Sequence, residues 1–322
     1  MNIKNKRILV TGGCGYVGSV LVQNLLKKNY KVVVVDKQWF GNYLKEDGNL
    51  KVINCDIRQL EKINFQDIQT VIHLAGVAND LGVELNPALS WEINVLATHE
   101  IMEKIINESD VKQIIFASSG SVYGVKEEEN VTENLRLLPI SVYNKTKMVA
   151  EKVLLNYKDK LKVQCIRPAT VCGFSPRMRL DVAVNMLTFQ ALKNKEINVN
   201  GGNQIRPNIH IKDLSDAFIH LIENENISSG LYNAGFENLS IKEIAEKIRN
   251  KIDSKINIMP LVDPRSYRLN SEKLIKTGFK NNFNVDNAID EIIEKYNNKE
   301  LIEHDSFYTV KWMKHLTTEK LL

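Results

Sequence analysis

The sequence lacks the features that mark several classes of protein. Only 4 of its 322 residues are cysteine, and none of them has the C-x-x-C spacing of a metal or redox motif. We therefore expect no disulfide framework and no metal site, and predict that the cysteines are small apolar core residues: Cys14, Cys55, Cys165 and Cys172. No stretch approaches the ~18 apolar residues of a membrane helix, and residues 1–6 contain no apolar targeting segment. The expectation is a cytoplasmic protein without a membrane partner.

An excess of charge of one sign is also missing. Lys and Arg number 43 and Asp and Glu number 39, which gives a formal net charge of +4. Because the charges are interspersed, we expect no nucleic-acid partner. Hydrophobic residues make up 43% of the chain and charged residues 25%, as in ordinary globular proteins. The length is enough for about two domains with a core that needs no covalent cross-links.

Glycine is not frequent, but three glycines stand where a strand must turn into a helix. Gly12, Gly15 and Gly18 lie in segment 11–18, directly after an apolar run at 7–10. In this pattern the first glycine permits a tight turn, the second lets backbone N–H groups approach phosphates, and the third lets the helix pack close to the strand. The N-terminus of that helix then faces the anion. The spacing predicts a seat for a pyrophosphate.

An acidic residue follows at the distance expected for a dinucleotide site. Helical apolar spacing after Gly18 leads to a buried strand at 31–35, which ends in Asp36. Asp36 stands 36 − 18 = 18 residues after Gly18, close to the roughly 20 expected for the carboxylate that accepts the adenosine ribose hydroxyls. The next two residues are Lys37 and Gln38, so no arginine stands there to offset the negative charge of Asp36 and accept a 2′-phosphate. The predicted cofactor is therefore NAD.

Short strand-like runs alternate with helical patterns along the chain. The further strand-like runs are 51–54, 70–75, 114–118, 163–167 and 231–234, and the long helical patterns are 90–107 and 141–157. Such alternation predicts an α/β fold, a Rossmann-type doubly wound parallel sheet covered on both faces.

The pattern changes after Gly173. Residues 180–193 indicate a helix, 197–210 a short antiparallel pair broken at 200–203, 240–252 a capped helix, and the tail from Asp286 more helix. We expect a smaller, mixed carboxyl-terminal domain woven into the first. The predicted boundaries are 1–173 and 207–235 for the NAD-binding domain, and 174–206 and 236–322 for the substrate-binding domain.

Hydroxyl groups and a Tyr–Lys pair supply the candidate chemistry. Ser119 and Ser121 lie at the end of a predicted central strand, where ligands gather in parallel sheets. Tyr143 and Lys147 share one face of a predicted helix. A lysine ammonium, helped by a positive nicotinamide ring, favours the phenolate and lowers a tyrosine pKa from about 10 toward neutrality. Such a tyrosine can take the proton of a sugar hydroxyl while hydride leaves the same carbon.

These motifs, in this order, resemble those of the extended short-chain dehydrogenases/reductases of the NAD-dependent epimerase/dehydratase family, and the resemblance covers almost the whole chain. It implies NAD as cofactor, a nucleotide-diphosphate sugar as substrate, and Ser119, Tyr143 and Lys147 as catalytic residues. The implied cofactor-binding residues are Gly12, Gly15, Tyr16, Val17, Gly18, Asp36, Asp56, Ile57, Leu74, Ala75, Gly76, Asn94, Tyr143 and Lys147. Asp56 and Ile57 would lie by the adenine, and Asn94 would steady the active-site helix.

The same resemblance implies where the substrate binds. The implied substrate-binding residues are Ser119, Ser121, Asn185, Arg206 and Arg268. Asn185 and Arg206 take the places of groups that hold the diphosphate, for which a bidentate guanidinium is well suited.

Four further arginines and one histidine are candidates for positions near the substrate. Arg265 and Arg268 are candidate second clamps, with solvated surface arginines as the alternative. Arg177 and Arg179 could close a loop above the sugar. His210 is expected to order the turn before the next helix and not to transfer protons.

Departures from the family pattern narrow the reaction. Dehydratases of the family carry an acid just after the catalytic serine, since elimination of water needs an acid and a base, whereas this chain has Gly120 and Ser121. Epimerases acting at the 3- or 5-position use a cysteine and a histidine where this chain has Ser121 and Phe174–Ser175. A 4,6-dehydratase is therefore the weakest enzymatic alternative. Ala169–Thr170 replaces an asparagine-containing pair that is common in the family's epimerases, so the pattern does not identify which sugar binds.

Hydride transfer at one carbinol carbon remains intact in this pattern. We expect it at the sugar 4-position, which makes the protein a 4-epimerase or a 4-dehydrogenase, with a 4-keto reductase as the alternative. Outside the enzymes the alternative is an NAD-sensing regulator, although a sensor has no need of a tuned phenol. The resemblance also implies a homodimer formed through the helices at 90–107 and 141–157.

Overall fold

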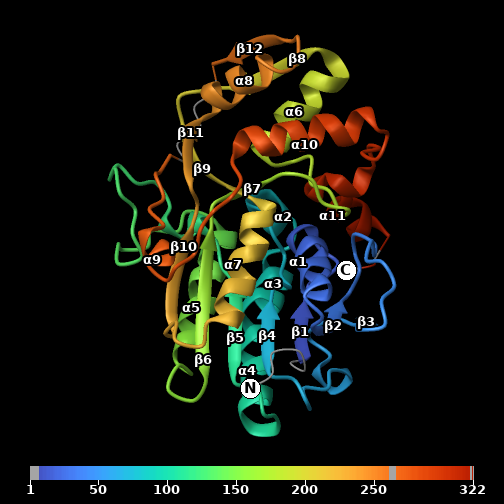
Figure 1. The fold of residues 1–322 in the computed structure, drawn as a ribbon, viewed down its shortest axis with the longest axis vertical. Coiled ribbons are helices and arrows are strands. Elements are labelled where there is room, and N and C mark those ends of the chain that lie inside the picture. The colour runs from blue at the N-terminus through green and yellow to red at the C-terminus, as the bar shows by residue number, and fades with distance from the viewer. Residues whose placement is uncertain (1–6, 261–265, 320, 322) are drawn as a thin grey trace.

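The central sheet is parallel and doubly wound. The computed structural model describes residues 7–260, 266–319 and 321, and among these seven strands pair in the order β10-β6-β5-β4-β1-β2-β3 (Figure 1). Their pairings are parallel. The strands are β1 (Arg7–Thr11), β2 (Lys31–Asp36), β3 (Leu50–Asn54), β4 (Thr70–His73), β5 (Gln113–Ala117), β6 (Lys162–Pro168) and β10 (Gly230–Ala234). The α/β fold predicted from the sequence is confirmed, and its order reverses between β1 and β4, where such sheets bind ligands.

Helices cover both faces of this sheet because successive strand residues point to opposite sides. Ile8 and Val10 of β1 pack in one cluster with α1 (Tyr16–Lys27) and α7 (Ile211–Glu223). Leu9 packs in the other with α4 (Ala97–Glu108) and α5 (Val142–Leu155). The helix predicted at 90–107 runs through α3 (Pro87–Trp91), the π-helical η3 (Glu92–Leu96) and α4. The four cysteines are buried free thiols, as predicted.

A second group of elements lies beyond the carboxyl ends of the central strands (Figure 1). Its helices α6 (Ala183–Asn194), α8 (Ile241–Arg249) and α10 (Val285–Asn297) share one apolar cluster. β8 (Glu196–Asn200) pairs with β12 (Lys255–Met259). A further sheet joins β11 (Glu237–Ser240), β9 (Ile205–His210) and β7 (Thr170–Cys172).

The antiparallel pair predicted for 197–210 is wrong. β8 pairs in parallel with β12, whereas β9 pairs antiparallel with β11 and parallel with β7. Gly201 and Gly202 both have positive φ, 73° and 116°. The Asn-Gly-Gly-Asn sequence does form a turn, but the turn sends its two strands into different sheets.

The remaining elements are short or lie near the end of the chain. They are η2 (Leu60–Lys62), α2 (Asp80–Glu84), η4 (Gly120–Tyr123), α9 (Glu272–Ile275), η5 (Asp305–Phe307) and α11 (Thr309–Thr318). The capping box predicted for α8 is present, because Ser240 Oγ accepts from Glu243 N at 3.1 Å and Glu243 Oε2 accepts from Ser240 N at 2.7 Å. Across residues 7–260, 266–319 and 321, no helix combines the length and apolar character needed to cross a membrane.

Candidate active site

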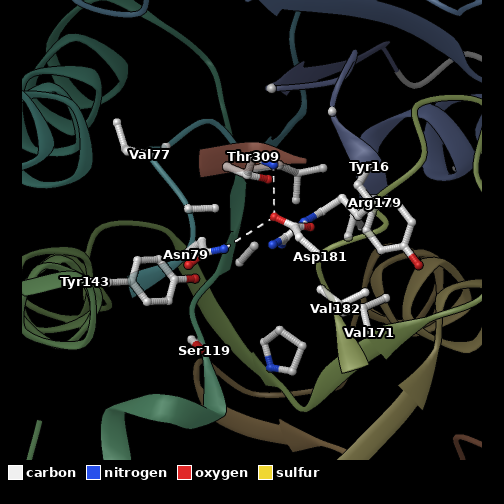
Figure 2. A pocket seen from close by; sticks show the side chains of 18 of the residues that line it. Tyr16, Val77, Asn79, Ser119, Tyr143, Val171, Arg179, Asp181, Val182 and Thr309 are labelled. Atoms are coloured by element: carbon white, nitrogen blue, oxygen red, sulfur yellow. Dashed lines mark hydrogen bonds and ion pairs between the residues drawn. The ribbon is translucent and has the colours of Figure 1, made fainter. Parts of the chain in front are cut away.

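A cavity of about 620 Å³ brings most of the predicted motifs together. It lies at the carboxyl ends of β1, β2, β4 and β5, and residues of the second group of elements also line it. Figure 2 shows Ser119 and Tyr143 on one side of this cavity and Val171 and Val182 on another. The predicted site residues that line it are Gly12, Gly15, Tyr16, Val17, Gly18, Asp36, Asp56, Ile57, Leu74, Ala75, Gly76, Ser119, Ser121, Tyr143, Lys147, Arg177, Arg179 and Arg206.

The glycine-rich turn forms part of the cavity wall in a conformation that side chains would block. Gly12 has φ of +72°, and a Cβ there would lie 2.5 Å from the backbone N of Ala75. A Cβ on Gly18 would lie 2.5 Å from the carbonyl oxygen of Gly12. Gly15 is the N-cap of α1, in an extended conformation. The turn therefore packs backbone against backbone and leaves the N-terminus of α1 facing the cavity.

Asp36 is held in place by the same turn. Its Oδ2 accepts from the backbone N of Cys14 at 2.9 Å, and its Oδ1 accepts from the backbone N of Gln38 at 2.7 Å. Burial raises the pKa of Asp36 above its usual value, and the two backbone N–H groups and the positive Arg177 oppose that shift. Each carboxylate oxygen keeps a lone pair, so the side chain can accept further hydrogen bonds from a ligand.

Asp56 lines the cavity and is paired with Arg58. Arg58 donates to it from Nε at 3.0 Å and from Nη2 at 2.8 Å. Burial alone would raise the pKa of Asp56, but the Arg58 guanidinium outweighs burial and holds the pKa below its ordinary value. The Asp56 carboxylate is thus kept ionised by a partner from its own segment.

Arg177 is a buried cation on the cavity wall. From the sequence we expected only that it could close a loop above the sugar. Its guanidinium lies 4.0 Å from the centre of the Phe40 ring, and burial together with nearby Arg179 lowers its pKa to about 9. Within the described residues, its buried Nε has no hydrogen-bond partner. Such a donor is costly unless a ligand satisfies it.

The catalytic candidates Ser119, Tyr143 and Lys147 all line the cavity. Tyr143 projects from the start of α5, and Ser119 lies at the end of β5 (Figure 2). The hydroxyls of Ser119 and Ser121 lie 2.7 Å apart. Burial raises the pKa of the Tyr143 hydroxyl, while Ser119 and the positive Arg179 act in the opposite direction. The lowering of the Tyr143 pKa expected from Lys147 together with a positive nicotinamide ring stays a prediction.

Lys147 is fixed one turn along α5. Its Nζ donates to the carbonyl oxygen of Ala117 at 2.8 Å and lies 4.7 Å from the centre of the Phe116 ring. Burial lowers the Lys147 pKa to about 8, and the charge of Glu151 opposes that shift. The lysine thus joins α5 to the end of β5, on which Ser119 follows.

Asn94 lies behind the cavity and does not line it. Its Oδ1 accepts from Val77 N at 2.8 Å, and its Nδ2 donates to Val77 O and to Thr146 Oγ1, each at 3.0 Å. A Cβ on Gly76 would lie 2.8 Å from the same Oδ1. Asn94 therefore connects the segment after β4 with α5.

Asp181 holds together a wall of the cavity that the sequence analysis missed. Its carboxylate accepts from Arg179 Nε at 2.8 Å, from the backbone N of Thr309 at 3.0 Å and from Asn79 Nδ2 at 3.4 Å (Figure 2). Burial would raise the Asp181 pKa, but Arg179 outweighs it and keeps the pKa below its ordinary value. The R-x-D spacing of Arg179 and Asp181 was the available signal for the pair, and nothing local pointed to Thr309.

Several predicted residues are not brought to the cavity. Asn185 is buried, where its Oδ1 accepts from Gly173 N at 2.9 Å and its Nδ2 donates to Arg179 O at 2.9 Å and Tyr16 Oη at 3.0 Å. Arg268 is exposed and does not line the cavity, and Arg265 lies outside the described residues. His210 Nδ1 accepts from Lys212 N at 3.2 Å, which caps α7 and fits its expected role in the turn.

The residues fit a dinucleotide such as NAD. The side-chain-free turn leaves the N-terminus of α1 facing the cavity, as a pyrophosphate requires. The carboxylate oxygens of Asp36 retain lone pairs that can accept from hydroxyl groups. The Nε of Arg177 is a buried donor without a hydrogen-bond partner among the described residues, and it can donate to a ligand. Tyr143 and Ser119 supply hydroxyl groups for proton transfer and orientation in the same cavity.

Comparisons with known proteins agree with this geometry. Residues 8–235 match the model of the NAD dependent epimerase/dehydratase family. A UDP-glucose 4-epimerase of Halalkalibacterium halodurans is 30% identical over 298 residues, which are 83% of this chain and 87% of that one. Among solved structures, a UDP-N-acetylglucosamine 4-epimerase from Methanobrevibacter ruminantium M1 in complex with UDP-N-acetylmuramic acid has a TM-score of 0.85 at 25% identity, over 92% of this chain and 100% of that one.

A second solved structure carries the cofactor. MoeE5 in complex with UDP-glucuronic acid and NAD has a TM-score of 0.80 at 26% identity and covers 92% of this chain and 100% of its own. The chain described here therefore belongs to the NAD-dependent epimerase/dehydratase family, as an enzyme of the extended short-chain dehydrogenase/reductase type that uses NAD.

Proposed function

We propose that this enzyme is a nucleotide-sugar 4-epimerase that acts on UDP-sugars. The observation that carries the proposal is the presence of Tyr143 and Ser119 in the cavity that the glycine turn and Asp36 also line. Relatives that are UDP-sugar 4-epimerases support the choice of reaction and of nucleotide.

In the proposed mechanism Ser119 orients the 4-hydroxyl of the sugar and Tyr143 takes its proton. Bound NAD would supply the hydride acceptor and, through its positive nicotinamide ring, part of the field that lowers the Tyr143 pKa. Arg179 faces the same space and favours the phenolate form of Tyr143. Lys147, fixed on Ala117 O at 2.8 Å, holds the helix that presents Tyr143. After the 4-keto sugar has turned, Tyr143 returns its proton to the 4-oxygen, while the hydride would return to the opposite face of C4, and this completes the epimer.

We propose that 1–173 and 207–235 form the NAD-binding domain, and that 174–206 and 236–322 form the nucleotide-sugar-binding domain. Asn198, Asn200 and Arg206 line the cavity from the second of these. Arg206 would bind the diphosphate, which suits a planar guanidinium. Gly120 and Ser121 stand where dehydratases of the family carry an acid, which disfavours a 4,6-dehydratase.

We also propose a homodimer formed through α4 and α5. Trp91 is 37% exposed and Leu96 is 55% exposed on the helical run that leads into α4. Apolar side chains of this size on adjoining turns are suited to a protein interface.

Incubation of the purified enzyme with single UDP-sugars tests the reaction. The expected result is a 4-epimer in equilibrium with its substrate, with no accumulation of NADH at its absorbance band. A 4-keto sugar formed together with stoichiometric NADH would identify a 4-dehydrogenase instead, and a 4-keto-6-deoxy product would overturn our interpretation of Gly120 and Ser121.

A further inference from the structure

Helix α11 lies against the outer side of the cavity, far along the chain from the glycine turn. Thr309 and Met313 of this helix line the cavity. The helix contacts α2, and in Figure 1 it lies beyond the carboxyl ends of the strands. Met313 and Leu316 are buried in the core on the α4–α5 side of the sheet, so the helix is firmly seated.

One end of α11 is fixed to the segment that carries Arg179. The backbone N of Thr309 donates to Asp181 Oδ2 at 3.0 Å. The same carboxylate accepts from Arg179 Nε at 2.8 Å and from Asn79 Nδ2 at 3.4 Å. Figure 2 shows Asp181 between Asn79 and Thr309, close to the space that Tyr143 faces.

The next turn of α11 is fixed to the segment that follows Asp36. Trp312 Nε1 donates to the carbonyl oxygen of Trp39 at 2.5 Å. Trp39 and Phe40 line the cavity in a stretch, 37–41, that is neither helix nor strand. Arg177 lies over the Phe40 ring at 4.0 Å, so this stretch also contacts the segment that carries Asp181.

We propose that α11 is part of the cofactor site: through Trp312 and Thr309 it holds segments 37–41 and 177–181 over the bound dinucleotide and slows its release. Neither segment is helix or strand, so contacts from neighbouring elements help to hold its position. A dinucleotide leaving the cavity on this side has to displace them. The inference concerns the cofactor alone and does not depend on which sugar is oxidised.

The test measures the release of NADH in the absence of any sugar. The full-length protein is loaded with NADH, mixed with excess NAD, and the loss of bound-NADH fluorescence is followed by stopped flow. Trp312→Ala removes the ring and its hydrogen bond, and we expect release to become about 10-fold faster. Trp312→Phe keeps an aromatic ring but removes the N–H donor, and we expect a roughly threefold increase. The exposed Lys314 on the same helix provides the matched control, Lys314→Ala, with unchanged release.

Melting of each variant without NADH separates this effect from loss of folding. If Trp312→Ala does not fold, Trp312→Phe decides the question. Release from the folded variant at the wild-type rate would overturn the proposal, as would equal acceleration by Lys314→Ala. Because no sugar is present, neither result bears on the proposed epimerase reaction.

Discussion

Glu151 and Arg167 form a buried ion pair directly behind the catalytic residues. Arg167 donates to the Glu151 carboxylate from Nε at 2.8 Å and from Nη2 at 2.7 Å, and both side chains are 2% exposed. Ser118, the neighbour of Ser119, donates to the same carboxylate. Glu151 lies one turn after Lys147 on α5, so this single carboxylate connects β5, α5 and β6.

Glu151→Gln should destabilise the fold strongly. Removing the charge leaves Arg167 buried without its counter-ion, which costs about 3–5 kcal/mol of unfolding free energy. Urea unfolding followed by circular dichroism measures the change. The double variant Glu151→Met/Arg167→Met should lose less than the single variant, because it leaves no lone buried charge. A loss below about 1 kcal/mol in the single variant would contradict this role.

Tyr143→Phe should abolish turnover and leave NAD binding intact. The ring keeps its place in the cavity while the group that transfers the proton is removed, so the rate should fall about 10² to 10⁴-fold. Tyr157→Phe is the matched control, since the Tyr157 hydroxyl donates to Glu103 at the surface. Unchanged turnover in Tyr143→Phe would show that another group moves the proton.

Asp36→Ala should relax the preference for NAD over NADP. The carboxylate repels a 2′-phosphate and accepts ribose hydroxyls, so its removal should weaken NAD and improve NADP. The ratio of the two dissociation constants, obtained by titration, checks the prediction, with the exposed Asp110→Ala as control. Equal affinity of the unmodified enzyme for both dinucleotides would refute the assignment.

His73 should make stability depend on pH in the acid range. Its ring is 0% exposed, with Nδ1 2.7 Å from Thr11 Oγ1 and Nε2 2.9 Å from Thr98 Oγ1, and burial lowers its pKa to about 3. The unfolded chain takes up a proton near pH 6.5 and the folded chain does not. Its contribution is therefore present above pH 6.5 and is lost at about 1.4 kcal/mol per pH unit as pH falls toward 3.

Urea unfolding at a series of pH values tests this linkage. The variant His73→Gln should show a shallower loss of stability between pH 6 and 4 than the unmodified protein, with parallel curves above pH 7.5. Identical acid slopes in the two proteins would exclude His73 as the source.

Leu96→Glu should weaken the proposed dimer. A carboxylate placed at the centre of an apolar interface must be desolvated without a partner, so sedimentation at micromolar concentration should show monomers. Ile302→Glu, at a 72% exposed position on another part of the surface, serves as control. A monomeric unmodified protein would end the dimer proposal.

The parts of the site that depend on local sequence were predictable. Gly12, Gly18 and Asp36 lie within one strand–turn–helix–strand unit. Its backbone leaves no room for a side chain at Gly12 or Gly18. Tyr143 and Lys147 share a helix face by their spacing alone. The periodicity of hydrophobic residues and the residue types at turns thus predicted the sheet, its helices and the cofactor half of the cavity.

The parts that depend on tertiary contacts were not predictable. Asn185 has a polar side chain suited to a phosphate, but Gly173 and Tyr16, far away in sequence, satisfy it in the core. Burial, which a sequence does not reveal, raises the Tyr143 pKa. Thr309 donates its backbone N–H to Asp181 across 128 residues of sequence, and no local pattern predicts a contact of that separation.

The sequence separation between the residues of the cavity determines when the cavity can form during folding. Cavity residues extend from Gly12 to Met313, so its two ends meet only after nearly the whole chain has closed into one loop. Contacts of such long sequence separation form late, because the chain loses the conformational entropy of loop closure before the contacts contribute any stabilising energy. Refolding protein should therefore recover its helical signal before it recovers the capacity to bind NAD, and NAD binding reports on completion of the fold.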